Sequence, residues 1–332
     1  MKKKFLVTGG TGFIGAPLAL KLLQSGHDVR ILDNGFRGSS SRLGDRANEC
    51  EILTGDIRDP QVVDAAVRGV DAVCHLAFVN GTQYFYDRPA YVLDVGVKGM
   101  VNVLDSCIRR DVGELVLTSS SEVYQTPPVV PTDESVALSI PDVENPRYSY
   151  AGGKIISELM ALNYGRQYLK RVVIVRPHNV FGPDMGWEHV IPQFVSRAIQ
   201  SPGEFKIQGD GSQSRSFVYI DDFTDGLMCA IDRGQHLNLY HVGTTEEISM
   251  RELAGRVAAV LGISLKVIPG PEATGGTPRR CPSIAKIGAL GYEPKWKLDA
   301  ALRVTVEWYR SNQHLYKPRP IQGANLFIPE YK

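Results

Sequence analysis

A cluster of glycines close to the N-terminus restricts the fold of this 332-residue chain more than any other feature. Residues 7–15 read Val-Thr-Gly-Gly-Thr-Gly-Phe-Ile-Gly, and their glycines satisfy both G-x-G-x-x-G and the wider G-x-x-G-x-x-G spacing. Glycines at this spacing permit a tight turn, a close approach of the backbone to a pyrophosphate, and packing of a helix on the preceding strand. The apolar run 4–8 predicts that strand, and residues 12–25 predict a helix whose N-terminus faces the phosphates.

An acidic residue at the end of the next predicted strand, 28–33, narrows the choice of dinucleotide. Asp33 stands where a carboxylate bonds the ribose 2′-hydroxyl and repels a 2′-phosphate, which favours NAD over NADP. Arg37 and Arg42 follow closely and would tolerate a phosphate. A glycine turn in an unrelated α/β protein is the alternative, but the strand–loop–helix–strand order favours dinucleotide binding. We therefore predict that the cofactor is NAD.

Short apolar runs alternate with longer amphipathic segments through the first half of the chain. The predicted strands are 4–8, 28–33, 51–53, 72–77, 114–119 and 171–176, and the predicted helices are 12–25, 60–68, 89–110 and 148–169. Such alternation with nearly continuous apolar strands indicates a parallel sheet covered on both faces. The fold class is therefore α/β, with a Rossmann-type doubly wound parallel sheet.

The second half contains too few elements for another complete Rossmann half. The predicted elements are helices 189–201, 221–233, 249–262 and 299–312 and strands 205–208, 216–220 and 237–242. They suit a smaller, interleaved C-terminal substrate-binding lobe over the carboxyl ends of the sheet, where ligands bind in such folds. The expected division is 1–177 with 216–242 for the NAD-binding domain, 178–215 with 243–320 for the lobe, and 321–332 for a tail.

Composition excludes several classes of partner. The formal charge of +1 creates no global field for nucleic acid or an anionic membrane. The five cysteines are scattered without a C-x-x-C pair, which favours buried thiols in a cytoplasmic protein over disulfides or zinc. No apolar run approaches the roughly 20 residues that span a bilayer. His178 and His189 lack a carboxylate or cysteine at ligand spacing, so we expect no metal site.

Tyr150 and Lys154 form Tyr-x-x-x-Lys on a predicted helix and so share one face of it. The pair alone is weak evidence, because such spacing arises by chance on a helix surface. Its context strengthens it: the preceding strand ends in Ser-Ser-Ser-Glu-Val-Tyr at 119–124, so both groups lie at carboxyl ends of parallel strands. Gly152 and Gly153 lie inside the motif, and we expect them to be merely tolerated there, at a cost of about 1 kcal/mol each.

These motifs together resemble the extended short-chain dehydrogenase/reductase family, in its nucleotide-sugar epimerase and dehydratase branch. The other matching segments are Thr-Gly-Gly-Thr-Gly-Phe-Ile-Gly at 8–15, Gly-Asp-Ile at 55–57, His-Leu-Ala at 75–77, Arg-Pro-His-Asn-Val-Phe-Gly-Pro at 176–183 and Gly-Asp-Gly-Ser-Gln-Ser-Arg-Ser-Phe at 209–217. They follow the family's order over nearly the whole chain. The resemblance implies NAD as cofactor, a nucleotide-diphosphate sugar as substrate, and a homodimer through the helices near 89–110 and 148–169.

The resemblance also implies roles for individual residues. Tyr150 would be the base, Lys154 would stabilise its phenolate and bind the nicotinamide ribose, and Ser120 would hydrogen-bond the same substrate oxygen. The implied cofactor contacts are Gly9, Gly12, Phe13, Ile14, Gly15, Asp33, Asn34, Asp56, Ile57, Leu76, Ala77, Tyr150, Lys154 and Pro177. The implied substrate contacts are Asn179, Val190, Arg215 and Arg280, since a guanidinium suits a diphosphate.

The reaction itself stays open among members of this branch, which share oxidation at sugar C4. The 4,6-dehydratases carry Asp-Glu where this chain has Ser121 and Glu122, and Ser-Glu resembles the decarboxylases of UDP-glucuronate and some epimerase-like members. Glu122 would then be an acid/base or a local hydrogen-bond partner. Phe78, Gly96 and Gln125 also depart from the family's usual alanine, asparagine and glycine.

We favour a nucleotide-sugar 4-epimerase, with the dehydratase and decarboxylase as alternatives. A non-catalytic NAD(P)-binding sensor or scaffold on the same fold is the rival from another class. It would be expected to lack the serine, tyrosine or lysine, and this chain retains all three. A steroid- or flavonoid-type reductase would prefer NADPH and lack the motif around Arg215.

Overall fold

A seven-stranded parallel sheet forms the centre of the computed structural model, which describes residues 2–200, 203–271 and 276–316. The strand order is β11-β6-β5-β4-β1-β2-β3. The strands are β1 (Lys4–Thr8), β2 (Asp28–Asp33), β3 (Cys50–Thr54), β4 (Ala72–His75), β5 (Glu114–Thr118), β6 (Arg171–Pro177) and β11 (Asn238–Val242). The order runs outward in both directions from β1 and β4, which creates a crevice at their carboxyl ends. The predicted fold class is confirmed.

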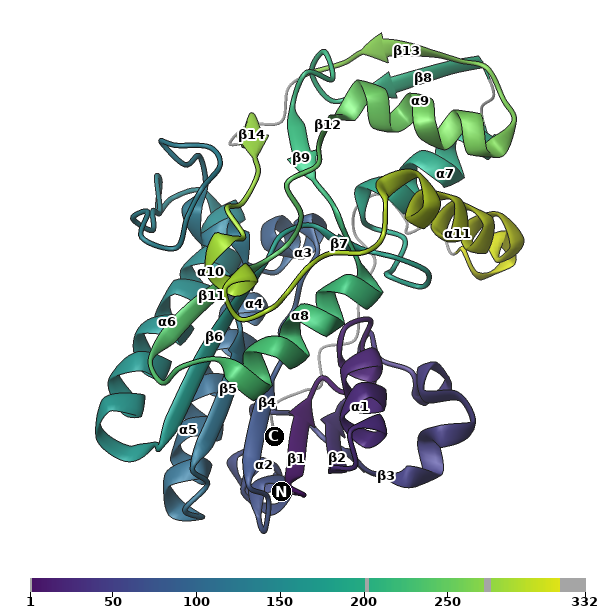
Figure 1. Cartoon of the computed structure of the whole chain (residues 1–332). Helices are drawn as coiled ribbons and strands as arrows, with labels where there is room; N and C mark the ends of the chain where they lie inside the picture. Colours follow the sequence, from purple (N-terminus) through teal and green to yellow (C-terminus); the bar gives the residue numbers. More distant parts are fainter. Residues whose placement is uncertain (1, 201–202, 272–275, 317–332) are drawn as a thin grey trace.

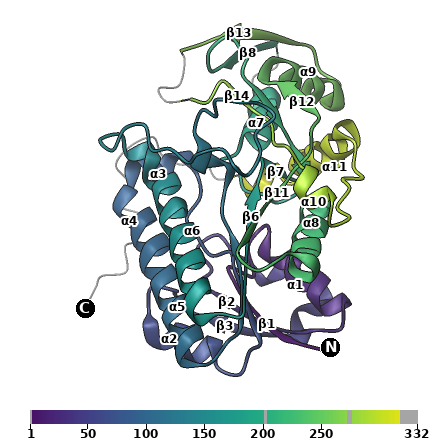
Figure 2. The ribbon, with the colours of Figure 1, turned by 60° about the vertical axis from the view of Figure 1, so that its left-hand side comes forward.

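Helices cover both faces of the sheet, as Figures 1 and 2 show. One face carries α2 (Pro60–Val67), α5 (Gly99–Arg109) and α6 (Ser149–Tyr168), and the other carries α1 (Gly15–Gln24) and α8 (Ile220–Arg233). Successive residues of β1 point to opposite faces, so Phe5 and Val7 join one buried apolar cluster and Leu6 joins the other. This double burial explains why the strands read as continuous apolar runs.

The helix predicted over 89–110 is interrupted. It consists of α4 (Pro89–Leu93), a π-helical turn (Asp94–Lys98) that contains Gly96, and then α5. A short helix not predicted from the sequence, α3 (Thr82–Asp87), precedes it. The first helix begins at Gly15 instead of residue 12, because Gly9, at φ 70°, and Gly12 form a turn closed by a 3.1 Å hydrogen bond.

The elements of the second half gather beyond the carboxyl ends of the sheet, in the upper part of Figure 1. They are the helices α7 (Val190–Gln200), α9 (Met250–Leu261) and α11 (Leu298–Ser311), and three groups of short strands. The strands pair as β7 (Val180–Phe181) with β10 (Val218–Tyr219), β8 (Gly203–Ile207) with β13 (Leu265–Pro269), and β9 (Ser214–Ser216) with β12 (Glu247–Ser249) and β14 (Arg279–Arg280). The short helix α10 (Ala285–Gly288) packs beside β11 and α8 instead. The strand predicted at 216–220 is wrong as one element, because β9 and β10 divide it. The strand predicted at 237–242 joins the main sheet as β11. The predicted tail lies outside the described residues.

Candidate functional site

A cavity of about 240 Å³ lies at the carboxyl ends of β1, β2 and β4. Most residues expected to contact the cofactor line it, namely Gly9, Gly12, Phe13, Ile14, Gly15, Asp33, Asn34, Asp56, Ile57, Leu76 and Ala77. The other three expected contacts, Tyr150, Lys154 and Pro177, are not among the lining residues. The expected contacts that line the cavity come from four separate chain segments that meet in one crevice, as expected for a doubly wound sheet.

The glycine loop is shaped for a diphosphate. A Cβ at Gly15 would lie 2.1 Å from the carbonyl oxygen of Gly9, so the close packing of helix on loop requires glycine. Gly9 itself adopts φ +70°, and a Cβ there would lie 3.0 Å from the backbone of Ala77. No side chain caps the N-terminus of α1, so no side chain competes with an anion for the positive end of this helix. These features fit the pyrophosphate of NAD.

The ribose end of the cavity is built around Asp33. Its carboxylate accepts hydrogen bonds from the backbone N–H of Thr11 (3.0 Å) and of Gly35 (2.9 Å), which hold it at the cavity wall. The two nearby arginines point to other acids: Arg42 Nε donates to Asp184 at 2.7 Å, and Arg37 reaches Glu188 at 3.4 Å. The Asp33 carboxylate is fixed in place, and Arg37 and Arg42 are already paired with other acids. This arrangement fits a ribose that carries no 2′-phosphate.

These two arginines form a clasp, Arg37 and Arg42, that joins the loop after β2 to the segment before α7. Arg42 also donates to the carbonyl of Thr11 at 3.1 Å, and Arg37 donates to the carbonyl of Asn80. Both arginines line the cofactor cavity. The sequence contained no signal for this clasp, because its partners are more than 140 residues apart.

The predicted catalytic residues Tyr150, Lys154 and Ser120 are brought together beside this cavity. Lys154 Nζ donates to the carbonyl of Thr118, at the end of β5, at 2.7 Å. Burial lowers the pKa of Lys154 to about 7. Burial also raises the pKa of the Tyr150 phenol, and a hydrogen bond with Ser120 opposes that rise. The hydroxyls of Tyr150 and Ser120 and the amine of Lys154 therefore lie close together in apolar surroundings.

A buried polar network that was not predicted extends from helix α6, which carries Tyr150 and Lys154. Glu158, one turn after Lys154 on α6, accepts two hydrogen bonds from Arg176 at 2.8 and 2.5 Å. Arg176 in turn donates to the hydroxyl of Tyr124, which lies 2.6 Å from His241 Nε2. Because Tyr124 ends the 3-10 helix Ser121–Tyr124, the network ties that segment to α6.

A second cavity, of about 890 Å³, adjoins the first. All four expected substrate contacts, Asn179, Val190, Arg215 and Arg280, line it together with Glu122, Arg147 and Arg197. Ser121 is buried and is not among the lining residues. A cavity with four arginines suits a polyanionic ligand such as a nucleoside diphosphate.

Glu122 lies at the end of this cavity nearest the catalytic residues and is ion-paired. Arg280 Nη1 donates to its carboxylate at 2.6 Å. Burial alone would raise the pKa of Glu122, but Arg280, Arg147 and Arg215 together hold that pKa below its ordinary value. The carboxylate is therefore ionised at neutral pH.

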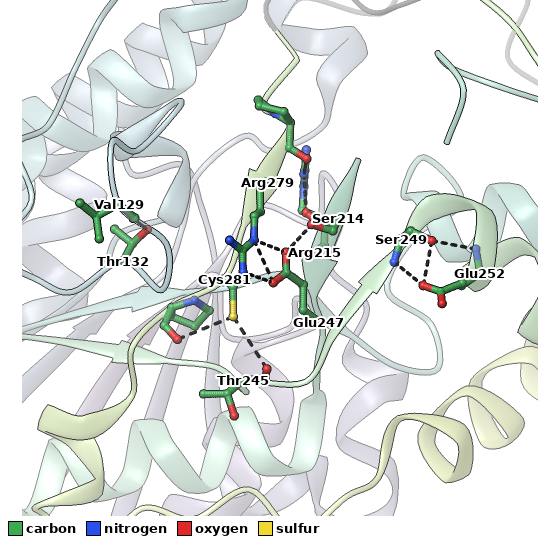
Figure 3. Close-up of polar contacts among 12 residues, drawn as sticks. Val129, Thr132, Ser214, Arg215, Thr245, Glu247, Ser249, Glu252, Arg279 and Cys281 are labelled. Carbon is green, nitrogen blue, oxygen red and sulfur yellow. Dashed lines mark hydrogen bonds and ion pairs between the residues drawn. The ribbon is translucent and has the colours of Figure 1, made fainter. Parts of the chain in front are cut away.

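The neighbouring arginines have different partners (Figure 3). Arg279 Nε donates to Glu247 at 2.8 and 3.0 Å, and Ser214 donates to the same carboxylate. Arg215 donates to the carbonyls of Ser214 (2.7 Å) and Thr277 (2.6 Å). The exposed Arg279 is thus paired with the half-buried Glu247, and Arg280 is the member of the Arg-Arg pair that lines the cavity.

The histidines considered for a metal lie apart from any such site. His178 is fully buried, and His189 contacts Arg37 at 3.3 Å on the wall of the cofactor cavity. Over residues 2–200, 203–271 and 276–316, no group of three or more His, Cys, Asp or Glu residues is arranged to hold a metal ion. Within the same ranges, no helix has the length and apolar character needed to cross a membrane.

The sheet order, the glycine loop and the buried Tyr150–Lys154 pair define a dinucleotide-dependent enzyme of the extended short-chain dehydrogenase/reductase type. Residues 5–243 match the model of the NAD dependent epimerase/dehydratase family, and the chain belongs to that family. Its cofactor is NAD.

Curated relatives of similar identity carry different activities. A UDP-N-acetyl-alpha-D-glucosaminuronate decarboxylase of Bacillus cytotoxicus is 30% identical over 93% of this chain and 98% of its own length. A putative UDP-glucose 4-epimerase of Methanocaldococcus jannaschii is also 30% identical, over 92% of this chain and 98% of its own length. Identity alone therefore does not separate the reactions of the family.

Solved structures that resemble this chain also belong to enzymes with different activities. A dTDP-glucose 4,6-dehydratase of Streptomyces venezuelae with NAD bound superposes with a TM-score of 0.86 at 30% identity and covers 95% of this chain and 99% of its own. The UDP-glucose 4-epimerase of Thermotoga maritima with UDP-glucose superposes with a TM-score of 0.83 at 25% identity and covers 93% and 99%. One scaffold thus serves several outcomes, and the local site must decide between them.

Proposed function

We propose that this protein is a nucleotide-diphosphate-sugar 4-epimerase that works through transient oxidation at sugar C4. In this proposal residues 1–177 and 216–242 hold NAD, and residues 178–215 and 243–320 hold the nucleotide diphosphate. The uncapped α1 and the glycine loop support the first assignment, and the arginine-lined cavity supports the second. The ionised state of Glu122 carries the choice of reaction.

Tyr150 is the proposed base for the C4 hydroxyl, with Ser120 hydrogen-bonded to the same oxygen. A buried phenol resists ionisation, so proton transfer requires positive charge beside it. NAD bound in the cavity at the carboxyl ends of β1, β2 and β4 would supply a hydride acceptor for C4 and part of that positive charge. Lys154 supplies the rest, with its Nζ 5.9 Å from the centre of the Tyr150 ring. The same Tyr150 then returns the proton when the alcohol is restored.

The pairing of Glu122 argues against 4,6-dehydration. Loss of the C6 hydroxyl requires a proton donor, and a neighbouring carboxylic acid must be protonated to serve. Glu122 is held ionised by Arg280 at 2.6 Å, so it could take the C5 proton but could not donate one to the C6 hydroxyl, and Ser121 stands where the dehydratases have their acid. Epimerisation needs no such acid, because Tyr150 and Ser120 handle the only proton that moves.

Decarboxylation is the second candidate, and Arg147 is the observation that favours it. Its guanidinium lines the substrate cavity close enough to lower the pKa of Glu122, and its Nε is buried without a hydrogen-bond partner in the described part of the chain. A carboxylate at sugar C6 would satisfy that donor. Decarboxylases are also among the curated relatives.

The test is incubation of the purified protein with UDP-, GDP-, CDP- and dTDP-sugars, including UDP-uronates, followed by mass spectrometry and NMR of the products. An unchanged mass with inverted C4 stereochemistry supports the proposal. Loss of water contradicts the role assigned to Glu122, and loss of carbon dioxide selects the second candidate. Tight binding without any turnover over the whole panel refutes the enzyme and selects the sensor or scaffold.

A further inference from the structure

Phe78 places an aromatic ring against both members of the catalytic pair. It follows Ala77 at the carboxyl end of β4 and lines the cofactor cavity. The centre of its ring lies 5.1 Å from that of Tyr150, with an interplanar angle of 82°. Lys154 Nζ lies 4.2 Å from the centre of the same ring. One side chain therefore contacts the base and the cation of the proposed chemistry.

Two glycines make the room for this ring. A Cβ at Gly96, in the π-helical turn, would lie 2.2 Å from Phe78 Cζ, and a Cβ at Gly153 would lie 2.9 Å from the same atom. A Cβ at Gly152 would meet only a side-chain atom of Ile140, at 3.8 Å. The expectation that both glycines of the Tyr-x-x-x-Lys segment are merely tolerated is thus wrong for Gly153.

We propose that Phe78 is a positioning residue for Tyr150 and Lys154, and that Gly96 and Gly153 are the positions that admit its ring. The face of a phenyl ring is negative and its edge is positive, so an ammonium over the face is attracted while an edge-to-face contact orients a second ring. The inference rests on the proposed function, because it takes Tyr150 as the base and Lys154 as its electrostatic partner.

The other polar groups around Lys154 do not fully compensate its positive charge, which leaves a role for the Phe78 ring. Glu158 on α6 raises the pKa of Lys154, but its two oxygens are held by Arg176. His75, at the end of β4, is uncharged at neutral pH because burial lowers its pKa to about 3. The carbonyl of Thr118 accepts one N–H of the ammonium. The Phe78 ring therefore adds to the stabilisation of a buried cation.

The first experiment replaces the ring with an aliphatic side chain. Phe78→Leu keeps an apolar contact and removes the aromatic face, so the pKa of Lys154 should fall by about one pH unit. Phe85→Leu is the matched control, because Phe85 stacks on Tyr150 at 5.0 Å and 18°. The Phe85→Leu variant should lower turnover without changing the pKa of Lys154. NMR of labelled lysine side chains, with Lys154→Arg for assignment, measures that titration without any substrate.

Turnover provides the second readout. Phe78→Leu should lower kcat about tenfold, the equivalent of one pKa unit, while KM for the nucleotide sugar stays within about twofold. An unchanged Lys154 titration together with an unchanged kcat would overturn the proposal.

The second experiment tests the steric part through unfolding temperature. Gly153→Ala and Gly96→Ala should each lower Tm in the wild-type background and cost much less in the Phe78→Leu background, where the colliding ring atoms are gone. Gly152→Ala is the matched control and should not lower Tm in either background. Equal losses in both backgrounds, or no loss at Gly153, would contradict the assignment.

These measurements separate the two proposals. If no nucleotide sugar is turned over, the proposed function fails, yet the lysine titration and the unfolding cycle still report on Phe78. If turnover is found but Phe78→Leu changes neither readout, only the inference about Phe78 fails.

Discussion

The two ion pairs Glu158–Arg176 and Glu307–Arg310 have the same closest distance and opposite environments. Both close to 2.5 Å. The side chains of Glu158 and Arg176 are 3% and 4% exposed, whereas those of Glu307 and Arg310 are 41% and 53% exposed. Substituting each glutamate by glutamine removes one charge at nearly constant shape, so the comparison isolates the effect of burial.

The expected losses differ several-fold. Glu158→Gln leaves the Arg176 guanidinium buried without its counter-charge, which costs about 3 kcal/mol of the free energy of unfolding. Glu307→Gln breaks a solvent-screened pair and should cost less than about 0.5 kcal/mol. For a chain of 332 residues, the first loss corresponds to a fall in Tm of roughly 4 °C and the second to less than about 1 °C.

Urea unfolding and thermal unfolding of the NAD-free protein measure both losses. The double variant Glu158→Leu/Arg176→Met should recover much of the loss, because it removes the uncompensated charge and keeps the volume apolar. Equal losses for the two single variants, or a double variant less stable than Glu158→Gln, would refute the reasoning that burial sets the value of the pair.

Four further predictions follow from the site. Tyr150→Phe should abolish turnover on the sugar panel while NAD still binds, and normal activity would contradict its role as base. Lys154→Met should lose turnover but stabilise the NAD-free protein at pH 7, by on the order of 2 kcal/mol. The pKa of Lys154 is lowered by burial from 10.5 to about 7, so between these values the unfolded chain binds a proton that the folded chain does not. The free energy of unfolding of the wild-type protein should therefore rise with pH between about pH 7 and 10.5. A free energy of unfolding that does not change with pH would refute this prediction. NADP should bind at least about fivefold more weakly than NAD, because two unit charges about 4 Å apart repel by about 1 kcal/mol even in bulk water. Asp33→Ser should narrow this difference in affinity, and calorimetric titration with both cofactors measures it. Arg42→Ala should release NAD about tenfold faster in a stopped-flow chase, whereas the exposed-pair control Arg46→Ala should not.

The sheet could be predicted from the sequence because its strands are buried on both faces and read as unbroken apolar runs. Helix α6 was predicted to within one residue at each end, since nothing interrupts it between Ser149 and Tyr168. The break near Gly96 was missed, because a π-helical turn inserts a residue while the apolar positions on either side still look helical. The strand predicted at 205–208 corresponds to β8, whereas β7, β9, β12 and β14 were missed because two or three residues carry too little pattern.

Some features of the candidate site could likewise be predicted from the sequence, and others could not. The glycine loop and Asp33 were predictable because their roles depend on backbone conformation and on position after a strand. The clasp of Arg37 and Arg42 was not, because Arg37 and Glu188 are 151 residues apart. The ion pair between Arg280 and Glu122, 158 residues apart, was hidden for the same reason.

Sequence patterns were enough to predict the class of fold and the cofactor, and they predicted that Tyr150 and Lys154, the proposed reactive pair, share one helix. Tertiary structure alone distinguished residues that are chemically identical and adjacent in the chain, such as Arg279 from Arg280 and Gly152 from Gly153. The physical reason is how far apart in the sequence the interacting groups lie. Backbone freedom and apolar periodicity act between neighbours in sequence, whereas charge pairing and steric contact act over a few ångströms between segments that only folding brings together.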